Sequence, residues 1–181
     1  IGGETNKRWD VSAQQDGSIM AWYNTSEISN GTYIIHIGSD TLIGANENSS
    51  NWFSYIGKNT ACTATNEESN PIIKNISSVR FASVKNMSNM FAYLGYSNMT
   101  TFSLGNNFFT TKAENMSGMF SNTGFSKMQS INLGTNFNTS KVQNMTSMFE
   151  RTGYTAMTSL NLGSKFIINT ENSVVMNNMF A

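Results

Sequence analysis

Asn86-Met87-Ser88-Asn89-Met90-Phe91 is the stretch of sequence that decides the fold, because the chain repeats it with small changes. It returns as Asn115-Met116-Ser117-Gly118-Met119-Phe120 and as Asn144-Met145-Thr146-Ser147-Met148-Phe149, and most of it returns as Met176-Asn177-Asn178-Met179-Phe180. The last phenylalanine of each copy is 29 residues from the next in two cases and 31 in the third. A fixed period of this length is the signature of a solenoid built from stacked repeats.

A short apolar pattern precedes each copy. Apolar residues at its first, fourth and sixth positions match the strand spacing of leucine-rich repeats. Neighbouring repeats are therefore expected to form one parallel β-sheet, in which the last two apolar side chains point inward and the residues between and before them point outward. The pattern occurs at Ile76/Val79/Phe81, Met99/Phe102/Leu104, Met128/Ile131/Leu133 and Met157/Leu160/Leu162.

A diverged first repeat begins before the methionine-rich copies. The segment 48–57 aligns without gaps on 86–95. The apolar pair Ile35 and Ile37 precedes it, and Ile37 is 16 residues before Phe53, the same step that separates Leu104 from Phe120 and Leu133 from Phe149. About five repeats are therefore predicted over 32–181, with a loop insert at 58–71.

The Asn-Met-Ser-x-Met-Phe phrase is expected to form the side opposite the sheet. Its apolar residues stand at i, i+3 and i+4, which one helical turn places together. Gly95, Gly124 and Gly153 follow the phenylalanines by four residues, where glycine commonly ends a helix, and an aromatic residue comes next each time. Each repeat is therefore predicted to contain a short helix or 3-10 turn. The apolar side chains of the predicted repeat core are Phe53, Met87, Met90, Phe91, Met116, Met119, Phe120, Met145, Met148, Phe149, Met179 and Phe180.

Residues 1–31 precede the repeats and are predicted to cap them. They contain two β-forming stretches around Trp9 and Trp22, with turn signals between and after them. A first repeat has no neighbour, so its open end needs a cover that is apolar inside and polar outside. The predicted fold is an α/β solenoid: a leucine-rich-repeat-like, right-handed coil with a parallel β-sheet on one face, short helices or 3-10 turns on the other, and a β-type N-terminal cap.

Composition excludes several classes of partner. The 181-residue chain has 11 basic and 11 acidic side chains, so no net charge attracts nucleic acid or an anionic membrane. Charged residues make up only 12% of the chain, and its polarity comes instead from Asn, Ser and Thr, which indicates an extracellular surface. No run of 18 apolar residues is present, so no segment is expected to insert into a membrane.

No catalytic or metal-binding pattern is present in the sequence. The single histidine, His36, lies on a predicted strand. The single cysteine, Cys62, lies in the predicted insert and has no second cysteine for an internal disulfide. A zinc site needs more ligands in one cluster, and no glycine-rich phosphate-binding motif occurs. The chain is therefore predicted not to be an enzyme and to use no cofactor and no metal.

The longer phrase Val-x-Asn-Met-Ser/Thr-x-Met-Phe, seen at 84–91 and 142–149, resembles the repeat of a family of bacterial surface proteins related to BspA-type leucine-rich repeats. The likeness extends over about 9–181 and includes the opening Trp9-Asp10. It implies a protein that is secreted or held at the cell surface and acts in adhesion or protein–protein contact. Two features depart from the family pattern: the period of 29 residues, and a Gly-x-x-Phe at 105–108, 134–137 and 163–166, where the family has aspartate after the strand.

Two functions follow as hypotheses. The first is a non-enzymatic extracellular or cell-surface module that binds a host or neighbouring-cell surface protein or glycan through the exposed face of its sheet. The second is a structural subunit that binds another copy of itself head-to-tail and builds a surface fibre, because the last repeat carries no cap. The outward residues of the predicted sheet, which form the candidate binding face, are Ile34, His36, Ser78, Arg80, Thr101, Ser103, Ser130, Asn132, Ser159 and Asn161.

Overall fold

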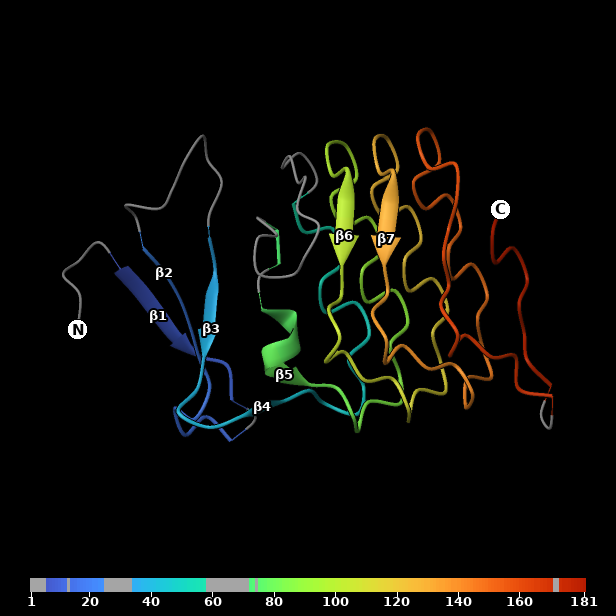
Figure 1. Cartoon of the computed structure of the whole chain (residues 1–181). Coiled ribbons are helices and arrows are strands. Elements are labelled where there is room, and N and C mark those ends of the chain that lie inside the picture. Colours follow the sequence, from blue (N-terminus) through green and yellow to red (C-terminus); the bar gives the residue numbers. More distant parts are fainter. Residues whose placement is uncertain (1–5, 13, 25–33, 58–71, 74, 171–172) are drawn as a thin grey trace. The chain divides into compact units, whose positions relative to one another are not determined.

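The computed structural model of the chain describes all residues except 1–5, 13, 25–33, 58–71, 74 and 171–172 (Figure 1). The predicted loop insert, with Cys62, lies outside the described residues. The chain divides into two compact units, Ile1–Ile43 and Gly44–Ala181. The boundary predicted after residue 31 falls inside the first unit.

The first unit contains a three-stranded antiparallel sheet. Its strands, in spatial order, are β1 (Asn6–Asp10), β2 (Met20–Asn24) and β3 (His36–Gly38). Trp22 lies opposite both Arg8 and His36, and its indole ring stacks on the imidazole ring of His36 with centroids 5.3 Å apart. The prediction that the strand at 35–37 opens a parallel sheet of the repeats is wrong, because β3 pairs antiparallel with β2.

A tight turn after β1 is organised by the carboxylate of Asp10. Its oxygens accept hydrogen bonds from the hydroxyl and the N–H of Ser12, at 2.5 and 2.8 Å, and from the N–H of Gly17, at 2.7 Å. The hydroxyl of Ser12 is the largest cause that lowers the pKa of Asp10 below its usual value, and the two N–H groups add to it.

We expect this turn to lose its stabilisation as the pH falls through the lowered pKa of Asp10. A carboxyl whose pKa is lower in the folded state stabilises that state above the unfolded pKa, and the contribution disappears as the folded carboxylate takes up its proton. Titration of the side-chain carboxyl carbon by NMR should place the Asp10 midpoint below that of an aspartate in an unfolded peptide. Ser12→Ala should raise the midpoint. An unchanged midpoint in this variant would show that the hydroxyl does not hold the carboxylate.

The second unit contains few and very short strands. The elements that follow β3 are β4 (Ile43–Gly44), which spans the boundary between the units, the 3-10 turn η2 (Ile76–Ser78), β5 (Val79–Arg80), β6 (Thr101–Ser103) and β7 (Ser130–Asn132). β6 and β7 pair in parallel, with Phe102 opposite Ile131, and they form a sheet of two strands. The equivalent apolar pattern at 157–162 forms no strand.

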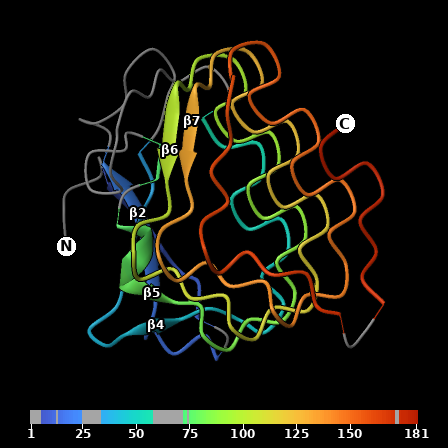
Figure 2. The same cartoon turned by 45° about the vertical axis from the view of Figure 1, so that its right-hand side comes forward.

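The predicted α/β solenoid is therefore wrong as a fold class. Among the residues that the structure describes there is no α-helix and one 3-10 turn, η2. The strands form small antiparallel and parallel sheets, not the single parallel sheet of a closed coil. Successive repeats of the second unit nevertheless lie side by side, as Figures 1 and 2 both show. The backbone of these repeats consists mainly of turns, with few strands and no α-helix among the described residues.

The Asn-Met-Ser-x-Met-Phe segments are strips of overlapping turns. The N–H groups of Met90, Ala92 and Leu94 each donate to the carbonyl three residues earlier, at 3.0 to 3.2 Å. The N–H groups between them cross to the next repeat: that of Phe91 donates to the carbonyl of Met119 at 2.9 Å. The backbone of each strip thus alternates between bonds within a repeat and bonds to its neighbour.

The crossing bonds line up in columns that run through successive repeats. One column consists of N–H to carbonyl bonds, each 2.9 Å long, from Phe53 to Met90, Phe91 to Met119, Phe120 to Met148 and Phe149 to Met179. Each accepting carbonyl and the next donating N–H belong to the same peptide group, so the amides form a continuous chain. Three further columns begin at the N–H groups of Ser49, Asn51 and Tyr55. All four columns point the same way, whereas the N–H groups of an ordinary strand alternate between its two edges. Hydrogen bonds linked in this way polarise and strengthen one another.

Left-handed residues at fixed places in each strip exclude a helix. The residue before the second methionine has a positive φ in each copy, with values of 54° at Asn89, 62° at Gly118 and 56° at Ser147. Another follows four residues later, as at Tyr93, with a φ of 60°. A positive φ at the third position of a turn defines type II geometry and does not continue a right-handed helix. The predicted short helices are therefore wrong.

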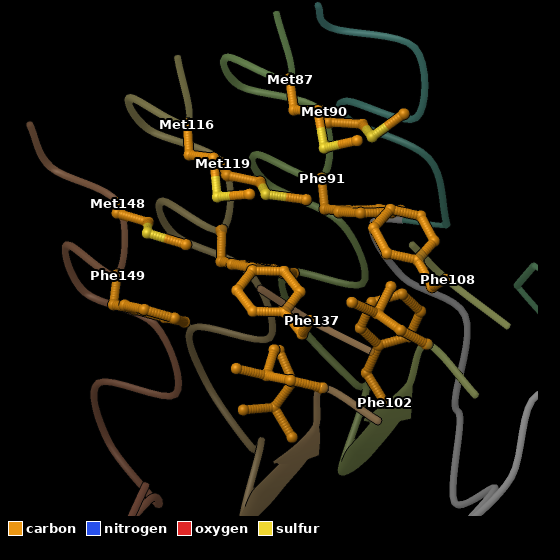
Figure 3. Close-up of a cluster of buried hydrophobic side chains, with 14 of the residues drawn as sticks. Met87, Met90, Phe91, Phe102, Phe108, Met116, Met119, Phe137, Met148 and Phe149 are labelled. Atoms are coloured by element: carbon orange, nitrogen blue, oxygen red, sulfur yellow. The ribbon is translucent and has the colours of Figure 1, made fainter. Parts of the chain in front are cut away.

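Methionine and phenylalanine side chains fill the interior of the second unit (Figure 3). Phe120 stacks on Phe91 and on Phe149, with ring centroids 5.5 and 5.3 Å apart. The row continues to Phe53 at one end and to Phe180 at the other, at 5.5 and 5.7 Å. Phe53 is half-buried, and Phe180 is 59% exposed, in contrast to the prediction that it is a core residue. The other ten residues of the predicted repeat core are buried: Met87, Met90, Phe91, Met116, Met119, Phe120, Met145, Met148, Phe149 and Met179.

Threonine hydroxyls add a second tie between repeats. The buried hydroxyl of Thr139 donates to the carbonyl of Ile167 at 2.8 Å and accepts from the N–H of the same residue at 2.7 Å. Thr110 makes the same pair of bonds with Asn138, each 2.7 Å long. These side chains extend the backbone pairing beyond the turn strips.

Thr139→Val keeps the shape of the side chain but leaves both backbone groups of Ile167 without this partner. We expect it to lower the free energy of unfolding by about 2 kcal/mol. Thr139→Ser retains the hydroxyl and should cost less. Urea unfolding of the whole chain followed by circular dichroism measures both variants. If the serine variant lost as much stability as the valine variant, the hydrogen bonds would not be the source of the effect.

Candidate functional site

The ten residues of the predicted binding face do not lie on one sheet. Ile34 and His36 belong to the first unit, where β3 carries His36. Ser78 ends the 3-10 turn η2, and Arg80 lies on β5. Thr101 and Ser103 lie on β6, and Ser130 and Asn132 lie on β7. Ser159 and Asn161 lie on a segment that forms no strand. The prediction of one continuous sheet face is therefore wrong.

Exposure separates these residues further. Ser103 is only 3% exposed, in contrast to the prediction that it points outward. Its hydroxyl oxygen accepts a hydrogen bond from the N–H of Gly105 at 3.3 Å, which holds the side chain against the bend that follows β6. Thr101 and His36 are half-buried. The other members of the predicted face are exposed: Ile34, Ser78, Arg80, Ser130, Asn132, Ser159 and Asn161.

Three equivalent segments, 96–103, 125–132 and 154–161, present the same kinds of side chain in successive repeats. Each begins with an aromatic residue and has polar residues at its fifth and sixth positions. Backbone bonds keep the segments in register, such as that from the N–H of Gln129 to the carbonyl of Thr100, at 2.8 Å. We call this set of equivalent residues the aromatic–hydroxyl face. Its half-buried members are Tyr96, Phe125, Thr100 and Thr101, and its exposed members are Tyr154, Gln129, Thr158, Ser130 and Ser159.

The aromatic side chains of this face stack in a row. The ring centroids of Tyr96 and Phe125 are 4.9 Å apart, and those of Phe125 and Tyr154 are 5.2 Å apart, with angles of 7° and 14° between the ring planes. The row extends from Tyr96 to Tyr93 at 5.9 Å and on to Tyr55 at 4.6 Å. The spacings are close to the separation of about 4.8 Å between paired strands, because equivalent residues of adjacent repeats supply most of the rings. Tyr55 and Tyr154, at the two ends, are each 65% exposed.

Sequence reasoning missed this row as a surface feature. The available signal was the aromatic residue directly after Gly95, Gly124 and Gly153. The helix prediction assigned these aromatics to positions just beyond a helix end, where no alignment between repeats is expected. Turn strips instead place them in register, and the rings stack.

A second exposed region of the same unit carries charges. The Nζ atom of Lys85 lies 2.7 Å from a carboxylate oxygen of Glu47, and this hydrogen bond is the main cause that raises the pKa of Lys85 above its usual value. Both side chains are about half exposed, so the pair contributes little to stability.

A shallow groove of about 520 Å³ is lined by Glu114, Ser140, Lys141, Gln143, Ile167, Ile168, Asn169 and Thr170. Its lining includes one acid and one base, and this set of groups is not repeated along the unit as the aromatic–hydroxyl face is.

Within the described ranges, no group of three or more His, Cys, Asp or Glu side chains could hold a metal ion. A helix long and apolar enough to cross a bilayer is likewise absent from that part of the chain. Comparison of the chain with protein-family models, with curated proteins and with solved structures gives no match. The site is therefore interpreted from its own chemistry.

Proposed function

We propose that the chain is a non-enzymatic module of an extracellular or cell-surface protein and that it binds a partner through the aromatic–hydroxyl face. One observation carries this proposal: three successive repeats present equivalent aromatic and polar side chains in register on the same unit. The resemblance of the repeat phrase to BspA-type surface proteins, which act in adhesion, supports the same role.

The backbone beneath this face favours binding. The amide columns and the buried phenylalanine row hold successive repeats together at fixed spacings. A surface held in place before the partner arrives loses less conformational entropy on binding. Stacked tyrosine and phenylalanine rings also offer a large contact area with few rotatable bonds.

The test compares adhesion of beads that carry the whole chain with that of bare beads on a panel of bacterial and animal cells. We expect the wild-type chain to increase adhesion and the double variant Tyr154→Ala/Ser159→Ala to remove most of the increase. Both residues are exposed, so the fold should survive, and circular dichroism checks this. Lys112→Ala is the matched control, because Lys112 is exposed outside the face. Adhesion no greater than that of bare beads would refute the proposal, and full adhesion by the double variant would exclude this face.

A structural subunit that pairs head-to-tail is the second candidate, and the polarity of the amide columns favours it. The N–H groups of Met176, Asn178 and Phe180 end three columns and have no acceptor among the described residues. The carbonyls that begin these columns, those of Asn48, Ser50 and Trp52, have no donor in the described part of the chain. One edge therefore offers donors and the other offers acceptors at equivalent positions.

Sedimentation velocity over a wide range of concentrations tests this second candidate. Head-to-tail pairing should raise the average mass with concentration, and Phe180→Ser should reduce the effect, because Phe180 ends the phenylalanine row and is 59% exposed. A mass that stays that of one chain at all concentrations would exclude assembly of this chain by itself.

A further inference from the structure

We infer that the partner of the aromatic–hydroxyl face is a neutral polysaccharide. This inference rests on the proposed function and adds the chemical class of the partner. It is drawn from the charge of the face, from its hydrogen-bonding groups and from the open ring of Tyr154.

The face is almost free of charge. The three segments 96–103, 125–132 and 154–161 contain one charged residue, Lys127, and one further cation, Arg151, lines the groove beside Tyr154. Binding of nucleic acid or of another polyanion depends on several cations that each neutralise a negative group. An uncharged partner is therefore the best electrostatic match.

The polar groups of the face suit a ligand that is rich in hydroxyl groups. Hydroxyl and amide side chains both donate and accept hydrogen bonds, as sugar hydroxyls do. Thr101, Ser130 and Ser159 occupy one equivalent position, and Thr100, Gln129 and Thr158 occupy the next. Parallel pairing repeats each position at intervals of about 4.8 Å. A linear polymer that lies along the repeats would meet similar groups at every step.

Tyr154 adds an apolar anchor at one end of the row. One face of its ring is covered by Phe125 at 5.2 Å, yet the residue is 65% exposed. Tyr154 also lines an open groove of about 320 Å³, together with the polar residues Thr158 and Ser159, with Arg151, and with Phe180 and Ala181. An aromatic ring combines an apolar face with, in tyrosine, a polar tip. The C–H face of a sugar ring can therefore pack on Tyr154 while its hydroxyl groups bond to the polar side chains.

The first arm of the test titrates the whole chain with dextran, mannan and a soluble β-glucan, and with dextran sulfate as the anionic counterpart of dextran. We expect calorimetry to show binding to a neutral polymer. Tyr154→Ala, and separately Thr158→Ala/Ser159→Ala, should weaken it about tenfold, while Lys112→Ala should leave it unchanged. Binding to dextran sulfate alone, or equal affinity in the wild type and both face variants, would overturn the inference.

The second arm separates this inference from the proposed function. Cells are treated with periodate, which cleaves the vicinal diols of sugars, or with protease, and are washed before the chain-coated beads are added. Loss of adhesion after periodate but not after protease supports a polysaccharide partner. Adhesion that survives periodate and is lost after protease overturns this inference and leaves the proposed function in place. Failure to adhere to any untreated cell overturns both.

Discussion

Replacing Phe120 with alanine is expected to lower the free energy of unfolding of the second unit by about 4 kcal/mol. The ring is fully buried between Phe91 and Phe149, at 5.5 and 5.3 Å, and its centroid lies 6.0 Å from that of Phe137. Truncation leaves a cavity in the middle of the row and removes three ring contacts as well as apolar burial. Urea unfolding of the whole chain, followed by circular dichroism, gives the change.

Phe109→Ala is the matched control for this prediction. Phe109 belongs to the same repeat as Phe120 and directly follows the buried Phe108, but it is 39% exposed. Its truncation should cost less than about 1 kcal/mol. Similar losses in the two variants would contradict the conclusion that the phenylalanine row, rather than aromatic content in general, holds the repeats together.

Gly134→Ala is expected to produce the second large effect, a loss of about 3 kcal/mol or more. Gly134 has a φ of +75°, and a Cβ atom there would lie 2.0 Å from the carbonyl oxygen of Gly105 and 2.9 Å from its carbonyl carbon. Both atoms belong to the backbone of the adjacent repeat, so the clash is relieved only if the two repeats separate. Left-handed geometry adds its own cost for any residue with a Cβ atom.

Gly163→Ala separates the two parts of this effect. Gly163 has the same φ of +75°, but nothing lies within 4 Å of the position that a Cβ atom would take there. It should therefore lose only the conformational part, about 1 to 2 kcal/mol. The difference between the two variants, measured by urea unfolding, reports the close approach of Gly105 and Gly134. Equal losses would mean that the repeats are not in contact at this point.

The repeat and its buried side chains are readable from the sequence because apolar spacing reports burial. Met87, Met90 and Phe91 recur with a fixed period, and each copy can bury its apolar side only against the next. The same reasoning has no way to tell that Phe180, which repeats the pattern, is 59% exposed. Burial of Phe180 depends on whether another segment packs over the last repeat, and the spacing of apolar residues does not report this.

The helix prediction failed because two backbone geometries satisfy one pattern. Apolar residues at i, i+3 and i+4 meet on one side of a helical turn, and they also meet in overlapping turns. The deciding difference is the positive φ at Asn89, Ser147 and Arg151, residue types that occur in both geometries. Gly118, at the position of Asn89, is a local signal for a left-handed residue inside the strip, and Gly95, Gly124 and Gly153 are further left-handed glycines where the strips end.

The sheet prediction failed for a different reason. Pairing depends on which segment lies nearest, and the apolar alternation of a strand does not name its partner. β3 pairs with β2 in a local antiparallel sheet, and β6 pairs only with β7. The residues of the predicted binding face therefore do not share one sheet. Of the predicted residues, Ser130 and Ser159 are exposed and Ser103 is buried. The stacked row of Tyr96, Phe125 and Tyr154 depends on the register between repeats, which the spacing of apolar residues does not report.

Scalar couplings across hydrogen bonds, measured by NMR on the isotope-labelled chain, test the one-way amide columns most directly. We expect the amide nitrogen of Phe91 to couple to the carbonyl carbon of Met119, and that of Phe120 to couple to Met148, because these bonds are each 2.9 Å long. Within a strip, the nitrogen of Leu94 should couple to the carbonyl of Phe91, at 3.0 Å. Couplings from each nitrogen to the carbonyl four residues earlier, with none between repeats, would show helices and contradict the columns.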